Sequence, residues 1–351
     1  MLETGVEGIN VNPVDRCRGL MVGLGVGNAL GVPQEGWPRH TVAASYPNGI
    51  REIELEPGEP DDDDLAQAII LAEAAIEAGF GDLDTDEIGR RFWVWAEENG
   101  RGLGIQTADV LSLIGGARPR CGLGFGLQAR EPTGLPAVEA ARQVWEESGR
   151  HSAGNGAVMR CAPLAIRWLR DDVALVRNTA LSAVTTHADP RCVWSAVLVN
   201  VAVAMLVSGE DVAVSEALKR TRRAAAELGD SLAGLGVAGT VPESVVDACS
   251  IAAGIAPADL ALDGLDMGYT LKAMQVALWC ATQATDFEEA LVAVVSAGGD
   301  TDTNGAVAGA VLGARFGFKA IPSRWRWRLA EIRPRSEALE VLADRCVAAS
   351  A

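Results

Sequence analysis

Glycine recurs at every fourth residue in two widely separated parts of this 351-residue chain. One set lies near the start of the chain and the other near its end: Gly19, Gly23, Gly27 and Gly31, and Gly305, Gly309, Gly313 and Gly317. Glycine inside a helix costs about 1 kcal/mol relative to alanine. A spacing of four places each set along one side of a helix, where missing side chains allow close backbone approach. These two glycine stripes therefore predict helices that pack tightly near the centre of the protein.

Helical periodicity also dominates the rest of the chain. Ala- and Leu-rich runs predict helices near 65–74, 84–98, 136–148, 156–170, 172–184, 191–208, 212–227, 243–255, 268–282, 287–297, 304–316 and 336–349. No convincing stretch alternates with a period of two between turn pairs, which argues against a sheet. The segments rich in Gly and Pro, at 57–60, 115–134 and 229–242, do not resemble domain linkers. We predict one all-α domain over residues 1–351.

Composition and charge exclude several classes of protein. The chain has 30 Lys and Arg against 47 Asp and Glu, a net charge of −17, which makes binding to nucleic acid or to a membrane surface unfavourable. Seven scattered cysteines without a CxxC pair indicate neither a disulfide framework nor a zinc knuckle. Residues 1–16 lack the pattern of a signal peptide, and the longest uncharged run, 193–209, is short for a membrane span. We expect a cytoplasmic protein with no membrane segment.

The first acidic cluster is a run of four aspartates, Asp61, Asp62, Asp63 and Asp64, directly before an apolar helix. Aspartate is favoured at helix N-caps and first turns, so capping is one explanation. Four adjacent carboxylates exceed what a cap needs, and they repel one another. A divalent cation would remove that repulsion, because hard cations bind several carboxylate oxygens. From the run alone, capping and metal binding are about equally supported.

A second acidic cluster follows two glycines near the C-terminus, in the segment GGDTDTNG over residues 298–305. Asp300 and Asp302 are two residues apart and can converge on one ion, while Thr303 offers a hydroxyl where the following helix starts. An N-cap with an Asx-turn would need only one of these side chains. The segment does not match an EF-hand loop, because the glycine and the distant glutamate are misplaced.

Three further segments have the composition of ligand-binding loops. GLGVGNALGVPQE, over residues 23–35, is unusually dense in glycine and ends on Glu35. GNGAVMR, over residues 154–160, places Asn155 and Gly156 at a helix start, where backbone amides can bind an anion; an ordinary turn that caps the helix fits as well. THADP, over residues 186–190, presents His187, one of three histidines, between two helices. A lone histidine is more often structural than functional.

Taken in order, these five segments resemble the ADP-ribosylglycohydrolase family. The family pattern has GDALG-x-P-x-E, a TDDT-type acidic segment, GNGxxMR, TH-xx-P and GGDTDT. The corresponding segments here are GNALGVPQE, DDDDL, GNGAVMR, THADP and GGDTDT, and the resemblance covers about residues 15–320. It implies an orthogonal all-α helical bundle with two Mg²⁺ or Mn²⁺ ions in a central cleft.

The resemblance also implies a set of metal ligands. Aligning the Ala-Glu-Ala sequence at 72–74 with the family makes the first three ligands Asp62, Asp63 and Asp64, with a register starting at Asp61 as the alternative. The remaining family ligands correspond to Asp300, Asp302 and Thr303.

Substrate and catalytic residues follow from the same resemblance. Glu35 matches the glutamate that closes the family site, and Glu35, Asp63 and Asp302 are the candidate catalytic residues. Asn155 and Gly156 match residues that line ribose and phosphates, and His187 matches a histidine that contacts them. Tyr269 lies where family members carry an aromatic residue that stacks on adenine.

The chain departs from the family pattern at its first two motifs. The aspartate of GDALG is Asn28 here, and the two threonines of TDDT are Asp62 and Leu65. The expected activity is metal-dependent hydrolysis of the C1″ glycosidic bond of an ADP-ribosylated substrate. Three alternatives remain: an N- or O-glycosidase acting on a nucleotide, nucleoside or small ADP-ribose derivative, a non-catalytic ADP-ribose-binding relative, and an acidic helical scaffold. The ADP-ribose acceptor, the native metal and the oligomeric state do not follow from the sequence.

Overall fold

Helices form nearly all the regular secondary structure of the chain. The computed structural model describes residues 12–59, 61–115, 133–237, 239–252, 254–333 and 338–350. Across these residues there is no strand, and the only β-type pairings are two isolated bridges, between Trp37 and Gly299 and between Gly154 and Tyr269. The predicted all-α fold is confirmed.

The helices follow one another with short connections. The α-helices are α1 (Pro13–Gly31), α2 (Arg39–Ser45), α3 (Asp63–Glu77), α4 (Thr85–Glu98), α5 (Ile105–Gly115), α6 (Ala137–Glu147), α7 (Gly156–Arg160), α8 (Pro163–Arg167), α9 (Asp172–Val184), α10 (Pro190–Val207), α11 (Val214–Leu228), α12 (Asp230–Gly234), α13 (Glu243–Ala252), α14 (Thr270–Thr282), α15 (Phe287–Val295), α16 (Thr301–Phe316), α17 (Ser323–Ile332) and α18 (Leu339–Ala349). Short 3₁₀ helices are η1 (Val32–Gln34), η2 (Pro257–Asp259) and η3 (Phe318–Ala320).

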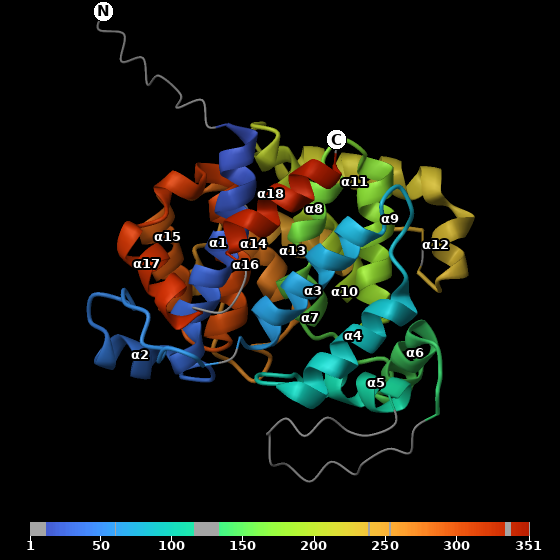
Figure 1. Ribbon diagram of the computed structural model, residues 1–351, viewed down its shortest axis with the longest axis horizontal. Coiled ribbons are helices and arrows are strands. Elements are labelled where there is room, and N and C mark those ends of the chain that lie inside the picture. The colour runs from blue at the N-terminus through green and yellow to red at the C-terminus, as the bar shows by residue number, and fades with distance from the viewer. Residues whose placement is uncertain are drawn as a thin grey trace, which may run out of the picture.

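The two glycine stripes meet each other at the centre of the fold. Helices α1 and α16 lie side by side, although one is near the start of the chain and the other near its end (Figure 1). They run antiparallel, and a Cβ atom added at Gly23 or Gly27 would lie under 3.0 Å from the backbone of Gly309 or Gly305. The predicted central packing of the stripes is confirmed. Gly317 is an exception, because it follows the last residue of α16 with a φ of 84°.

Helix α10 is another part of the core. Among the described residues it is the one helix that is long and apolar enough to cross a membrane, and 89% of it is buried inside the protein. That burial is typical of a core helix. The six cysteines in the described residues are buried, and no disulfide joins them to one another, as their scattered spacing predicts.

Several local predictions need correction. The helix predicted over 156–170 is divided into α7 and α8, because Pro163 lacks an amide hydrogen and begins a new helix instead of continuing the old one. The predicted connector over 229–242 contains the short helix α12. Helices α2, α5 and α17 were not predicted. Residues 116–132 of the predicted loop over 115–134 lie outside the described residues.

Candidate active site

The first acidic cluster lies at the start of α3, with most of its side chains buried. Asp62 occupies the N-cap position, yet its side chain makes no capping hydrogen bond to the helix. Asp62, Asp63 and Asp64 are 4%, 7% and 0% exposed. Burying three adjacent carboxylates is unfavourable unless something compensates their charge. Capping therefore does not account for this run.

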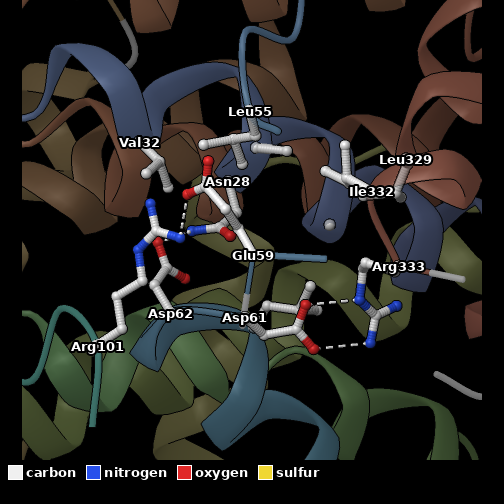
Figure 2. A pocket seen from close by; sticks show the side chains of 13 residues that line it. Asn28, Val32, Leu55, Glu59, Asp61, Asp62, Arg101, Leu329, Ile332 and Arg333 are labelled. Carbon is white, nitrogen blue, oxygen red and sulfur yellow. Dashed lines mark hydrogen bonds and ion pairs between the residues drawn. The ribbon is translucent and has the colours of Figure 1, made fainter. Parts of the chain in front are cut away.

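Asp61, the first residue of the run, forms an ion pair with an arginine. Its carboxylate accepts two hydrogen bonds from Arg333, at 2.6 Å from Nε and 2.9 Å from Nη2. Figure 2 shows this pair on one side of a small pocket, with Asp62 turned toward Asn28 on the other side. The negative charge of the Asp61 carboxylate is thus balanced by the guanidinium of Arg333.

The second acidic cluster begins at a turn that only glycine can form. Gly298 and Gly299 have φ values of 79° and 77°, and a Cβ atom at either would lie under 3.0 Å from the backbone of a neighbouring segment. Asp300 then occupies the N-cap position of α16 without a capping hydrogen bond. Asp302, in the first turn, is 3% exposed.

Glu35 is joined to this turn by the backbone. The amide of Gly36 donates to the carbonyl of Gly299, and the amide of Gly299 donates to the carbonyl of Trp37, both at 2.8 Å. This pairing fixes the segment after η1 beside Asp300. Glu35 itself is exposed to solvent.

The two clusters and Glu35 converge, although more than 230 positions of sequence separate the two aspartate clusters. Ligand atoms of Asp62, Asp64 and Asp302 lie within 4.8 Å of one another, and the same holds for Glu35, Asp300 and Asp302. Four buried carboxylate oxygens have no hydrogen-bond partner among the described residues: Asp62 Oδ1, Asp64 Oδ1, Asp64 Oδ2 and Asp302 Oδ1. Converging oxygen atoms without a donor are what a hard divalent cation binds.

Several carboxyl groups of the cluster have raised pKa values, which a bound cation would lower. Burial raises the pKa of Asp64 and Asp302 well above their ordinary range, and the surrounding carboxylates raise both further. Burial likewise raises the pKa of Asp62 to about 6. Partial desolvation, followed by the charges of Asp300 and Asp62, raises the pKa of Glu35 to about 7.

Asp63 and Thr303 are the two remaining predicted metal ligands. Among the described residues, Asp63 belongs to neither group of three converging acidic ligands. Asp63 faces the turn at Gly102, and burial followed by the charge of Asp62 raises its pKa well above the ordinary range. Thr303 is 5% exposed and lies near Asp64, where it partly offsets the rise in the pKa of that carboxyl.

The GNGAVMR segment is attached to the same site. The backbone N–H of Asn155 donates to the Gly268 carbonyl at 3.0 Å, and the Asn155 side chain donates from Nδ2 to Asp300 Oδ2 at 2.6 Å. The backbone bridge between Gly154 and Tyr269 holds the tyrosine beside this turn. The Tyr269 hydroxyl accepts a hydrogen bond from Arg191 Nη1 at 3.3 Å.

His187 is buried against that turn. The side chain is 2% exposed, and a Cβ atom at Gly156 would lie 2.7 Å from its Cε1. Glycine is therefore required at 156 by the close approach of the imidazole. The structure thus brings the predicted substrate residues to one side of the acidic cluster.

Three residues in or near the site were not among the candidates. Arg101 lies in the pocket of Figure 2, where it forms an ion pair with Glu59 at 2.6 Å, and nothing in the sequence around it indicated this position. Arg160 is fully buried at the end of GNGAVMR, so the motif itself was the available signal. Asn28 donates from Nδ2 to Asp62 Oδ2 at 2.9 Å.

The contact between Asn28 and Asp62 joins two positions that depart from the family pattern. By the resemblance described above, Asn28 corresponds to an aspartate of the family pattern, and Asp62 corresponds to a threonine. The number of carboxylates across this pair of positions is therefore unchanged. The carboxylate of this pair lies at the start of α3, where its ligand atom is within 4.8 Å of those of Asp64 and Asp302.

Comparison with known proteins gives a consistent set of relatives. A family model described as ADP-ribosylglycohydrolase matches residues 10–351. An ADP-ribosyl-[dinitrogen reductase] glycohydrolase from Rhodospirillum rubrum is 27% identical over 94% of this chain and 97% of its own length. The ADP-ribosylhydrolase ARH3 of Bos taurus is 26% identical, covering 89% of this chain and 88% of its own length. A solved structure titled ADP-ribosylglycohydrolase-related protein complex superposes with a TM-score of 0.69 at 26% identity, covering 97% of this chain and 99% of its own.

Proposed function

Because this chain belongs to the ADP-ribosylglycohydrolase family of hydrolases, we propose that it is a metal-dependent enzyme that cleaves the C1″ glycosidic bond of an ADP-ribosylated substrate. One observation carries the metal-dependent part of this proposal. Asp62, Asp64 and Asp302 converge within 4.8 Å and leave buried carboxylate oxygens without hydrogen-bond partners. A protein interior keeps such a group of carboxylates only when bound protons or a cation compensate their charge, and a divalent cation does so for several carboxylates at once.

The donor set fits Mg²⁺ or Mn²⁺. Both ions prefer oxygen ligands. Among the described residues, the converging ligand atoms are all carboxylate oxygens, with no cysteine sulfur and no histidine nitrogen. We assign six residues to two such ions: Asp62, Asp63, Asp64, Asp300, Asp302 and Thr303. The ion pair of Asp61 with Arg333 supports a register that begins at Asp62, because a carboxylate bound to arginine is a poor competitor for a cation.

The bound ions would orient the ribose diol and lower the pKa of an attacking water. The protein's own groups supply the rest. Glu35, whose pKa of about 7 leaves it poised between its two protonation states, can transfer a proton to or from the reacting oxygen. We assign the carboxylates of Asp63 and Asp302 to stabilising an oxocarbenium-like transition state by their negative charge.

The GNGAVMR turn beside the acidic cluster is our candidate site for the ADP-ribose moiety. Asn155 is 8% exposed and bonded to Asp300, so a ligand on the GNGAVMR turn would lie directly beside the acidic cluster. We assign Asn155, Gly156 and His187 to ribose and phosphate, and Tyr269 to the adenine ring. The relatives include hydrolases named for ADP-ribosylarginine and for ADP-ribosyl-[dinitrogen reductase], so a panel of substrates is needed to identify the acceptor.

The test is a substrate panel with the full-length protein. Proteins ADP-ribosylated on arginine or on serine, and ADP-ribosylated nucleic acid, are incubated with Mg²⁺, with Mn²⁺ or with EDTA, and released ADP-ribose is measured. Glu35→Gln is the matched control, because it keeps the shape of the side chain and removes its charge. We expect turnover of at least one substrate that needs the metal and falls about 10²–10⁴-fold in the variant. Turnover that is unchanged in EDTA, or unchanged in Glu35→Gln, contradicts the mechanism.

A further inference from the structure

Arg160 is a fully buried cation whose polar contacts come from several helices. Its Nη1 donates to Gln67 Oε1 on α3 at 2.6 Å. Its Nη2 donates to the Ser182 carbonyl at 3.1 Å and to Thr186 Oγ1 at 2.7 Å. The guanidinium carbon lies 4.8 Å from the centre of the Phe92 ring. Burial lowers the pKa of Arg160 only to about 10, so it stays protonated at neutral pH.

The bond from Arg160 decides what the Thr186 hydroxyl does. A guanidinium has hydrogen-bond donors and no acceptor, so Thr186 Oγ1 must accept from it. The hydroxyl keeps one hydrogen of its own to donate. Its other neighbour is His187 Nδ1, at 2.7 Å. Thr186 is 0% exposed, and the described residues offer its hydroxyl no other acceptor, so the hydrogen goes to Nδ1.

The tautomer of His187 follows from this chain of donors. Because Nδ1 accepts a hydrogen bond, it carries no hydrogen, and in a neutral imidazole the hydrogen is then on Nε2. Burial, followed by the charge of Arg160, lowers the pKa of His187 well below its ordinary value, so the ring is neutral. Nε2 lies against the GNGAVMR turn, 3.3 Å and 3.0 Å from where Cβ atoms of Gly154 and Gly156 would be. It forms no hydrogen bond within the described residues.

We propose that Arg160 and Thr186 are positioning residues that hold His187 in its Nε2–H tautomer, so that the imidazole presents one fixed hydrogen-bond donor to the turn at 154–156. The ligand for that donor is an oxygen atom without a hydrogen to give, such as a phosphate oxygen of ADP-ribose. This choice of ligand rests on the proposed function, whereas the tautomer rests only on the contacts of the protein.

The tautomer can be measured directly by ¹⁵N NMR of the metal-free, full-length protein. The chain has three histidines, and the exposed His40 and His151 serve as internal references. His187→Gln identifies the resonances of the buried ring. We expect a pyridine-type Nδ1 and a pyrrole-type Nε2 for His187. A pyrrole-type Nδ1, or two averaged nitrogens, overturns the proposal without any measurement of activity.

Thr186→Val and Thr186→Ser form a matched pair for the role of the hydroxyl. Valine removes the hydroxyl at nearly constant shape, whereas serine keeps it. We expect Thr186→Val to lose the pyridine-type Nδ1 signal and to bind ADP-ribose about tenfold more weakly by calorimetry, the value of one ordinary hydrogen bond. Thr186→Ser should match the wild type in both measurements.

The two proposals can fail separately. Unchanged ¹⁵N shifts and unchanged ADP-ribose affinity in Thr186→Val overturn the positioning role. A wild-type protein that has the Nε2–H tautomer but does not bind ADP-ribose supports the positioning role and contradicts the proposed substrate instead. If Thr186→Val fails to fold, the tautomer of the wild type and of Thr186→Ser still decides the question.

Discussion

Replacing Asp302 with asparagine tests whether the acidic cluster is organised around cations. The change keeps the shape of the side chain and removes its charge. Asp302 is 3% exposed, its Oδ1 has no hydrogen-bond partner, and burial together with the charges of Asp300 and Asp64 raises its pKa well above the ordinary range. In the metal-free protein this carboxylate should therefore oppose folding at neutral pH.

The sign and size of the effect follow from linkage between protonation and folding. A carboxyl whose pKa is higher in the folded state binds more protons there, so the free energy of unfolding decreases as pH rises from the unfolded-state pKa of about 4. A tenfold difference in proton affinity between the folded and unfolded states corresponds to about 1.4 kcal/mol. Asp302→Asn in EDTA at pH 7 should gain about 1–3 kcal/mol of stability, or about 1–4 °C in Tm for a protein of this length, and little at pH 4.

Adding metal should reverse the order of the two proteins. Mn²⁺ at about one thousand times its Kd stabilises a folded protein by about 4.1 kcal/mol, and this gain belongs to the wild type if Asp302 is a ligand. Thermal melts followed by circular dichroism, in EDTA and in MnCl₂ at pH 7, measure both effects. The wild type should melt lower than Asp302→Asn in EDTA and higher in MnCl₂.

Asp61→Asn is the matched control for this experiment. It removes a carboxylate from the same run but breaks the ion pair with Arg333. It should lower Tm under both conditions and leave the response to Mn²⁺ intact. A lower Tm for Asp302→Asn in EDTA would refute the reasoning, because the carboxylate would then be a structural cap.

Three further changes test other parts of the structure. Gly27→Ala places a Cβ atom against the backbone of α16 and should be at least about 2 kcal/mol more destabilising in denaturant unfolding than Gly25→Ala, whose Cβ meets only leucine side-chain tips; equal losses would contradict the packing argument. Asn28→Asp puts a second carboxylate beside Asp62 and should lower the metal-free Tm at pH 7 but not at pH 4, whereas equal melting with the wild type at pH 7 would count against this contact. Metal binding should release more protons at pH 6 than at pH 8, because the pKa is about 6 for Asp62 and about 7 for Glu35; calorimetry in buffers of different ionisation enthalpy measures this release, and equal release at both pH values argues against it.

The sequence by itself determined the helical class and the chemistry of the two acidic clusters. Helical periodicity and the cost of glycine within helices are local properties, so they predicted the two helices that carry the glycine stripes and most of the other helices. They failed where the local pattern is short or broken. Pro163 divides one predicted helix, and the seven-residue α2 is too short for periodicity to detect.

Only the tertiary structure decided which residues face each other. The antiparallel contact of α1 with α16 carries Glu35, at the end of one stripe, to Asp302, at the start of the other. The roles of Asp61 and Asp62 diverge although they are adjacent, because Arg333 reaches the first and Asn28 the second. Spacing along the chain does not encode such partners. Arg333 and Asn28 are far from the aspartates in sequence, and the packing of distant helices brings them close in space. The sequence therefore supplied the chemical groups, and packing of distant helices supplied their geometry and their pKa values.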